Sequence, residues 1–309
     1  MTQIEAREII HPVGNLEVMP GMEDLHHEVM IPFGRQTADL ITGQINEGKE
    51  IVVACFLNGA IIPIAQTIAQ LRRDAYEGKI TDDLYQQACN SIVLFERIRA
   101  KNAETNKKET VATLAHPDIL HTVTTAINVD DIAETLETTD DLHETFPNAE
   151  IIIAAAVKKH KTNGPLQQRG FPAQFICEVG DKWLLSGCGM DGSNKFEEEL
   201  TQYQLAELSI LQRCSNVGIY KNQDKGSDPD YKQQFNFFCK HSQLLPWVTQ
   251  LHSYNRFNNS DVDADFLNEL IELELAKMKK DYTRQMKLGK QIVDNFSQLD
   301  YSDVVKITQ

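Results

Sequence analysis

The sequence contains no hydrophobic run long enough to cross a membrane and no apolar segment at its start that would direct secretion. No run approaches the length of about eighteen uncharged apolar residues that indicates a membrane span. The first eight residues, MTQIEARE, lack the apolar core of a secretion signal. We therefore expect a cytoplasmic protein without a membrane segment.

Clustered cysteines and an excess of positive charge are also missing. The six cysteines are scattered without a CxxC motif or a Cys/His cluster, which predicts small buried thiols and neither disulfides nor a zinc site. The net charge of -15 disfavours a nucleic-acid partner, because such partners need a basic face. An acidic protein can still bind phosphorylated metabolites through backbone amides, a few cations and Mg²⁺.

The pattern of apolar residues predicts an α/β fold with a mostly parallel, twisted sheet flanked by helices. Of the 309 residues, 41% are hydrophobic and 24% charged, as in ordinary globular proteins. Apolar runs that look like buried parallel strands alternate with segments of helical spacing. The expected strands are 51–57, 91–98, 123–129, 150–158, 175–178 and 182–185, and the expected helices include 33–48, 62–71 and 138–146.

Two segments between these elements lack an apolar period. Residues 74–90 are polar and helix-prone, and we expect them to leave the core. Residues 99–110 carry Lys101, Lys107 and Lys108 among polar neighbours, which predicts a mobile loop.

The character of the chain changes near residue 200, so we expect an α/β domain over 1–200 and a helical extension of unknown role over 201–309. A long amphipathic helix is predicted over 265–296. The apolar stripe along this helix either packs on its own domain or forms a contact in a homo-oligomer. The residues of the stripe are Leu267, Ile271, Leu275, Met278, Tyr282, Met286, Val293 and Phe296.

The strongest chemical signal follows the third strand. Asp130 and Asp131 come directly after its carboxyl end, and a polar turn then leads into a helix. Amides at a helix start point toward an anion, and ligands of parallel sheets lie beyond the carboxyl ends of the strands. Two carboxylates beside such an anion site could hold a sugar diol, directly or through Mg²⁺. Alone, a pair of acids is more often a solvated turn or a helix cap.

The segment Asn128–Thr138 resembles the phosphoribosyl-pyrophosphate signature of the type I phosphoribosyltransferases: an apolar strand, two acids and then Thr-Gly-x-Thr. Further matches, in the same order and spacing, resemble the hypoxanthine-guanine (6-oxopurine) branch. They are Leu57-Asn58-Gly59-Ala60, Val157-Lys158-Lys159 and Asp181-Lys182-Trp183-Leu184-Leu185 followed by Gly187-Cys188-Gly189-Met190-Asp191. The resemblance covers residues 33–191, about half of the chain.

This resemblance implies an Mg²⁺-dependent transfer of a phosphoribosyl group from phosphoribosyl pyrophosphate to a purine base, with release of pyrophosphate. It places Glu134 as the residue that exchanges the purine N7 proton and Lys158 as the reader of the 6-oxo group. Trp183 would stack on the base, with Leu184 on the same base-stacking strand. The remaining implied contacts are Asn58 and Gly59 to pyrophosphate, Asp130 and Asp131 to the ribose hydroxyls and metal, Thr135, Leu136, Glu137 and Thr138 in the turn around the 5′-phosphate, and Asp191 to Mg²⁺.

The chain departs from this pattern at several positions. Leu136 replaces the glycine of Thr-Gly-x-Thr, where a Cβ atom crowds the phosphate or demands a disfavoured torsion. Glu197 stands near the family's arginine for pyrophosphate, and Asn58 stands where many members have lysine. Leu136 and Glu197 favour the alternative of a phosphoribosyltransferase-like domain without turnover that binds a nucleotide or a protein. The retained Asp130, Asp131, Glu134, Lys158 and Asp191 favour the enzyme. The same site could also act on another nucleobase or in a related glycosyl transfer.

Overall fold

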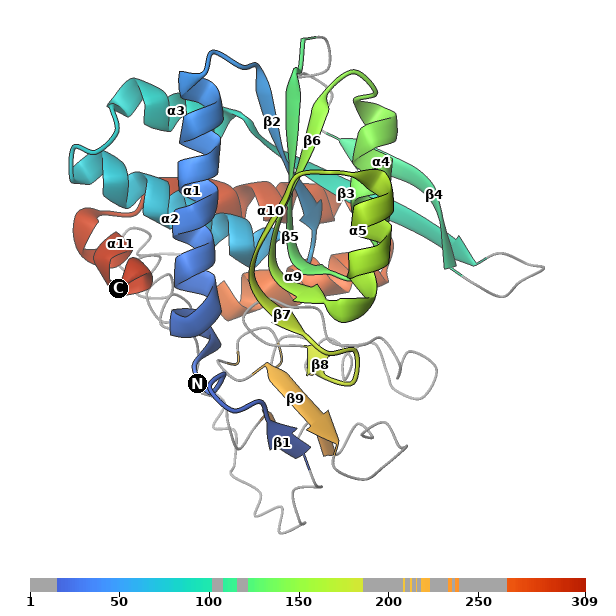
Figure 1. The fold of residues 1–309 in the computed structure, drawn as a ribbon. Helices are drawn as coiled ribbons and strands as arrows, with labels where there is room; N and C mark the ends of the chain where they lie inside the picture. The colour runs from blue at the N-terminus through green and yellow to red at the C-terminus, as the bar shows by residue number, and fades with distance from the viewer. Residues whose placement is uncertain are drawn as a thin grey trace.

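A six-stranded sheet forms the centre of the protein in the computed structural model (Figure 1). The structure describes residues 16–101, 108–115, 122–185 and 266–309, together with isolated positions between 208 and 238. Five neighbouring strands are parallel and the sixth, β4, is an antiparallel edge. In spatial order the strands are β4 (Lys108–Ala115), β3 (Ile92–Lys101), β2 (Ile51–Leu57), β5 (Thr125–Ala133), β6 (Glu150–Lys159) and β7 (Ala173–Val179). The predicted α/β fold class is confirmed.

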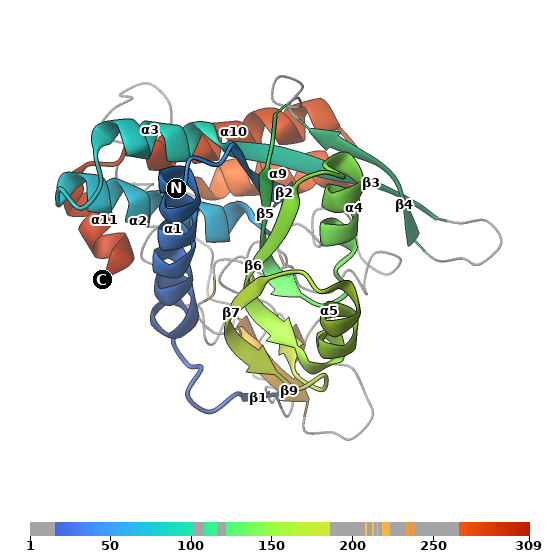
Figure 2. The same cartoon turned by 45° about the horizontal axis from the view of Figure 1, so that its top comes forward.

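Helices cover both faces of this sheet (Figures 1 and 2). One face packs on α1 (Ile31–Asn46), α2 (Ile61–Tyr76) and α10 (Tyr282–Ser297). α11 (Tyr301–Thr308) packs on α2 and α1 instead. The opposite face packs on α4 (Glu137–Thr145) and on the segment around α5 (Asn163–Arg169). Burial on both faces explains why β2 and β6 read as continuous apolar runs.

A smaller sheet lies beside the main one. Its three antiparallel strands, in spatial order, are β1 (Leu16–Val18), β9 (Ile219–Asn222) and β8 (Leu184–Leu185). β8 lies within the strand predicted over 182–185. β9 falls in the part of the chain for which only a helical extension was predicted.

The segment 74–90 does not leave the core as predicted. It contains α3 (Asp82–Asn90), which is capped by the Thr81 hydroxyl, an acceptor for the Leu84 amide. Tyr85 and Ala88 are buried, and the Tyr85 hydroxyl donates to the Ser297 carbonyl at 2.8 Å. One face of a short polar helix is therefore enough to hold it on the domain.

The loop predicted over 99–110 is largely strand. β3 continues to Lys101 and β4 begins at Lys108, so the described part forms an antiparallel hairpin. An edge hairpin needs no apolar alternation, which is why its polar sequence resembled a loop. Residues 102–107 lie outside the described residues.

The long helix predicted over 265–296 is two helices, α9 (Phe266–Met278) and α10. Lys280 between them has a φ of 56°, and the Asp281 carboxylate caps α10 by accepting from the Arg284 amide at 3.1 Å. A third helix, α11, was not predicted. α10 packs on α2 and β3. Met286, Val293 and Phe296 of the predicted stripe pack on the main core. The side chains of Leu267 and Ile271 lie outside the described residues, and a contact of the stripe in a homo-oligomer stays a prediction. The boundary of the helical extension at 201 stays a prediction.

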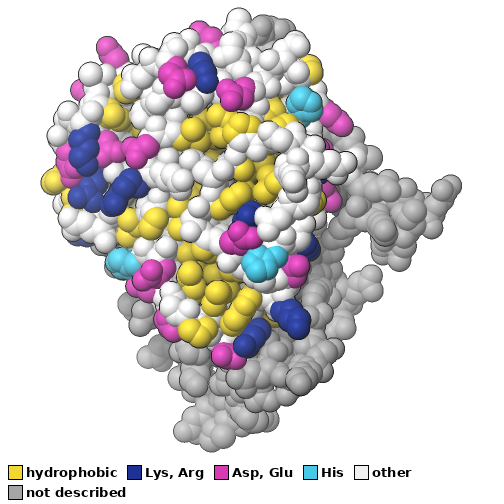
Figure 3. Space-filling model, viewed as in Figure 1, with side chains coloured by type: hydrophobic (Ala, Val, Ile, Leu, Met, Phe, Trp, Pro, Cys, Tyr) yellow, Lys and Arg dark blue, Asp and Glu magenta, His cyan; other side chains and the backbone are white. Residues whose placement is uncertain are grey.

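Three further features concern the cysteines, the length of the helices and the surface charge. Cys55 is buried, Cys89 and Cys177 are partly buried, and all three are free thiols. Among the described residues, no helix has the length and apolarity to cross a bilayer. On the face shown in Figure 3, lysine and arginine side chains lie beside acidic ones.

Candidate functional site at the carboxyl edge of the sheet

The turn after β2 and the two acids of β5 lie together at the carboxyl edge of the sheet. β2 and β5 pair in parallel, with Cys55 opposite Val129. A Cβ atom on Gly59 would lie 2.9 Å from Asp131 Oδ1, so only glycine lets the turn pass this close to the acid. The structure thus brings the turn at Gly59 against Asp131.

Asp130 and Asp131 lie within β5, because this strand continues to Ala133 and does not end at 129 as predicted. Asp130 Oδ1 accepts from the Asp131 amide at 3.0 Å, and Asp130 Oδ2 accepts from the Thr138 hydroxyl at 3.0 Å. Asn128 Nδ2 lies 3.2 Å from Thr138 Oγ1. These bonds tie the start of α4 to the acid of the neighbouring strand.

The electrostatics of this acid pair favour a nearby cation. Burial, followed by repulsion from Asp131, raises the pKa of Asp130 well above its ordinary value. Mg²⁺ is commonly held by one or two carboxylates together with water and substrate phosphates, and a divalent cation would offset the repulsion between the two acids. Asp130 and Asp131 therefore fit this metal. The third predicted ligand, Asp191, lies outside the described residues, among which no cluster of three or more His, Cys, Asp or Glu side chains forms a metal site.

The turn between β5 and α4 has the conformation that the missing glycine would favour. Leu136 has φ 61° and ψ 13°, the left-handed region, and its side chain is buried against Ala133, Ile153 and Ala155. Of the two consequences expected from replacing the glycine, crowding or a disfavoured torsion, Leu136 shows the disfavoured torsion. Its packing supplies the free energy that holds this conformation.

The other side chains of this turn are more exposed. Glu134 and Thr135 are exposed, and Glu134 pairs with Lys161 at 2.5 Å. Glu137 pairs with Arg97 at 3.2 Å. Glu134 is thus free of the core, as an acid that exchanges a proton with a bound base must be.

The two lysines at the end of β6 have different surroundings. Lys158 Nζ lies 2.8 Å from Glu178 Oε2 and 2.7 Å from Asn163 Oδ1. Lys159 is buried instead, and its ammonium donates to the Trp183 carbonyl. The structure therefore brings Lys159 to Trp183, whereas Lys158 lies with Glu178.

Burial lowers the pKa of Lys159, and the sequence argument gave this lysine no role. The signal that could have drawn attention to it is its place beside Lys158 at the end of an apolar strand. The Trp183 ring lies 4.8 Å from Lys221 Nζ of β9. Leu184 follows in β8 and packs with Tyr220, Phe237 and Phe238.

Arg97 on β3 is a second residue that the sequence argument missed. Its side chain is 7% exposed and pairs with Asp141 at 2.5 Å and with Glu137 at 3.2 Å, both on α4. Its guanidinium also donates to the Thr110 hydroxyl of β4 at 2.5 Å. The cation thus joins the β3–β4 hairpin to α4, the helix that follows the turn at Leu136. An arginine at the end of an apolar strand was the available sequence signal.

No protein-family model matches the sequence, and no curated protein matches it. Solved structures with a similar fold include type I phosphoribosyltransferases. The hypoxanthine phosphoribosyltransferase of Trypanosoma cruzi in complex with the product IMP is 13% identical, with a TM-score of 0.34 over 61% of this chain and 92% of that one.

Two further structures give comparable values. The hypoxanthine phosphoribosyltransferase of Staphylococcus aureus is 13% identical, with a TM-score of 0.32 over 56% of this chain and 90% of that one. The purine phosphoribosyltransferase of Pyrococcus horikoshii is 16% identical, with a TM-score of 0.30 over 48% of this chain and 83% of that one.

Proposed function

We propose that this protein transfers a phosphoribosyl group from phosphoribosyl pyrophosphate to a 6-oxopurine base and releases pyrophosphate. The observation that carries the proposal is the meeting of three sequence-predicted elements at one edge of the sheet. They are the Asn58–Gly59 turn, the acids Asp130 and Asp131, and the start of α4 with Thr138 bonded to Asp130. Parallel sheets bind their ligands at this edge.

In the proposed site, Asp130 and Asp131 hold the ribose hydroxyls. Amides at the start of α4, with Thr135 and Thr138, bind the 5′-phosphate, because a helix N-terminus favours an anion. The backbone of Asn58 and Gly59 binds the leaving pyrophosphate. Placed around one sugar, these groups orient the base and the anomeric carbon for displacement.

The acid pair would hold Mg²⁺, with Asp191 as a further ligand, and the metal would shield the charge of the pyrophosphate oxygens. Glu134 takes or gives the proton at purine N7, which its exposure permits. Trp183 and Leu184 bind the base. The Lys158 ammonium, which is paired with Glu178 in the structure, leaves that carboxylate and donates to the 6-oxo group of the base.

A second function is favoured by specific contacts. Leu136 fills the glycine position, Glu137 is paired with Arg97, and Lys158 is paired with Glu178. Each of these contacts narrows or occupies the proposed phosphate and base sites. A domain that binds a nucleotide without turning over phosphoribosyl pyrophosphate is therefore the alternative.

A transfer assay distinguishes the two functions. The full chain is incubated with phosphoribosyl pyrophosphate, Mg²⁺ and hypoxanthine or guanine, and nucleotide is measured by chromatography. We expect nucleotide to form, and Glu134→Gln to lower kcat about 100-fold with little change in KM, because a positioned acid–base group contributes at this scale. Glu144→Gln, on the exposed part of α4, is the matched control.

The absence of nucleotide for every base would exclude the transferase. A thermal shift with guanosine monophosphate that guanosine does not produce would then support the nucleotide-binding alternative. No shift with either ligand would exclude that alternative as well.

A further inference from the structure

A buried polar contact joins the C-terminal helices to the turn at the proposed pyrophosphate site. Asn58 Nδ2 donates to Glu274 Oε1 of α9 at 2.9 Å, and Gln285 Nε2 of α10 donates to Asn58 Oδ1 at 2.8 Å. Asn58 is 2% exposed, Glu274 3% and Gln285 0%. Both ends of the Asn58 amide are therefore held, one by each helix.

This polar contact lies in an otherwise apolar surrounding. The core cluster on this face of the sheet contains Leu57, Leu94, Ile292 and Leu273. Buried polar groups destabilise a core unless their hydrogen bonds are made, and apolar side chains could fill the same space without that requirement. The Gln285 amide and the Glu274 carboxylate make directional hydrogen bonds, so they fix one orientation of the Asn58 side chain.

The backbone of α10 also reaches the residue just before the turn. A Cβ atom on Gly289 would lie 3.1 Å from the Leu57 side chain and 3.3 Å from that of Leu94. A larger residue would push α10 away from the end of β2. The helix is thus fitted both to the last residue of the strand and to the first residue of the turn.

The next residue along the turn is in contact with the acid pair. Gly59 passes so close to Asp131 that an added Cβ would lie 2.9 Å from the carboxylate. A continuous set of contacts therefore runs from α9 and α10 through Asn58 and Gly59 to Asp131. α9 and α10 lie side by side (Figure 2).

We propose that Glu274 and Gln285 are positioning residues, through which α9 and α10 set the geometry of the Asn58–Gly59 turn against Asp131. This role rests on the proposed function of that turn in binding pyrophosphate. The C-terminal helices would thus contribute to a site formed by much earlier parts of the chain. Asn58 and Gln285 are 227 residues apart in the sequence.

The first test measures the turn itself and needs no ligand. Backbone amide hydrogen exchange is followed by mass spectrometry in peptides that include Ala60 and Ile61, whose amides bond to Phe56 and Asn58. Gln285→Met keeps the side-chain length and removes the donor. We expect exchange in the turn about tenfold faster than in the native chain, with β2 unchanged, as for the loss of one buried hydrogen bond.

Matched variants make this result specific. Gln291→Met places the same substitution on the exposed face of α10 and should leave exchange in the turn unchanged. Glu274→Gln keeps an acceptor for Asn58 and should preserve slow exchange, whereas Glu274→Leu should not. Should Gln285→Met fail to fold, the two Glu274 variants decide the same question. Unchanged exchange, or an equal rise in the turn and in β2, would overturn the positioning role.

The second test uses turnover. In the native background we expect Gln285→Met to lower kcat about tenfold, with the KM for the base unchanged, because a displaced pyrophosphate turn weakens transition-state binding and leaves the base site intact. Glu274→Gln should retain more activity than Glu274→Leu. A lower thermal stability with unaltered kcat would reduce the contact to a structural one. A native chain without transferase activity would refute the proposed function only, since the exchange result stands apart from it.

Discussion

At the scale of single residues, Leu136 has a strained left-handed backbone conformation. The family that the sequence resembles has glycine at this position. We compare Leu136→Gly with Leu136→Ala, since both remove the same buried packing and only glycine is relaxed at φ 61°. Each variant should lose about 2–4 kcal/mol of unfolding free energy through lost burial. Leu136→Gly should nevertheless be about 1 kcal/mol more stable than Leu136→Ala, the reverse of their order in an ordinary helix. Urea unfolding measures the difference.

The same glycine variant should bind nucleotide more tightly. Without the Cβ branch, the backbone of the turn can approach a phosphate more closely. Isothermal titration with guanosine monophosphate measures the affinity of the native chain and of Leu136→Gly and Leu136→Ala. If the glycine variant binds no better than the alanine variant, the torsion at this position does not limit phosphate binding.

His26 gives the protein a dependence on acidity. Burial, followed by the charge of the neighbouring His27, lowers the pKa of His26 from 6.5 to about 4. His26 Nε2 donates to the Ile307 carbonyl at 3.1 Å. On acidification the unfolded chain takes up this proton first. Its contribution to stability is thus fully present above pH 6.5 and is lost as the pH falls toward 4.

Replacing His26 removes that dependence. Between pH 6.5 and 4 the native chain should lose about 3 kcal/mol more unfolding free energy than His26→Gln, from the size of the shift. Glutamine still offers a donor to Ile307. Urea unfolding at a series of pH values measures both chains, with His143→Gln, which replaces an exposed histidine of α4, as the control. Parallel pH profiles for the native chain and His26→Gln would contradict the assignment.

At the scale of elements, Arg97 links the β3–β4 hairpin to α4. Burial raises the pKa of Asp141, while Arg97 counters this effect. Arg97→Met leaves Asp141 largely buried without its cation, and we expect a loss of about 3 kcal/mol of unfolding free energy at neutral pH. The double variant with Asp141→Asn should recover part of this loss, as measured by chemical unfolding. Independent, additive losses would show that the pair is not coupled.

The elements that the sequence predicted well are those whose pattern is set by burial. β2 and β6 are covered on both faces, so their apolar runs mark them within about one residue at each end. The β3–β4 hairpin and the break at Lys280 were not predicted. The hairpin edge is polar, and the break contains neither glycine nor proline, which usually mark such a point.

In the candidate site, too, the contacts between residues close in sequence were predictable, whereas those between distant segments were not. Asp130, Asp131 and the turn to Thr138 are close in sequence, so their meeting could be predicted from one strand and one helix start. The contacts of Asn58 with Gln285 and of Lys159 with Trp183 depend on how distant segments pack. No local pattern specifies such contacts, and the roles assigned to the individual site residues stay predictions.

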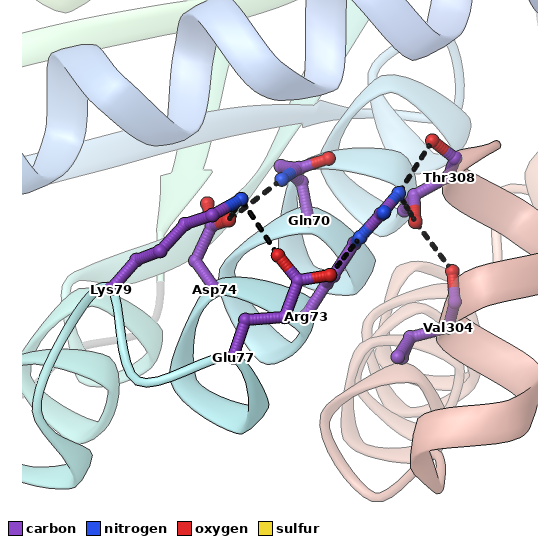
Figure 4. Close-up of polar contacts among 7 residues, drawn as sticks. All are labelled: Gln70, Arg73, Asp74, Glu77, Lys79, Val304 and Thr308. Carbon is purple, nitrogen blue, oxygen red and sulfur yellow. Dashed lines mark hydrogen bonds and ion pairs between the residues drawn. The ribbon is translucent and has the colours of Figure 1, made fainter.

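At the scale of the whole molecule, α11 closes the face formed by α1 and α2. Val304 and Ile307 are fully buried. Arg73 Nη1 donates to the carbonyl and hydroxyl oxygens of Thr308, each at 3.1 Å, and Gln66 donates to the Ile307 carbonyl at 3.0 Å. Figure 4 shows α11 meeting α2 through Arg73, which is also paired with Glu77 at 2.8 Å.

Removing residues 300–309 should therefore cost about 5 kcal/mol of unfolding free energy. Two buried aliphatic side chains are lost, and buried donors on α2 lose their acceptors. Urea unfolding of the shortened chain measures the loss, and the full chain with Tyr301→Ala, an exposed residue of α11, is the control. A loss below about 1 kcal/mol would show that α11 adds little to the core.

The long sequence distance between α2 and α11 has a consequence for biosynthesis. Gln66 and Ile307 are separated by 241 positions, so a ribosome has made the first helices long before their covering segment exists. Until then the apolar side of the nascent helices stays open to solvent, and folding must be completed late, with contacts of high sequence separation. We therefore expect chaperones that bind apolar segments to reduce aggregation of this chain during its synthesis.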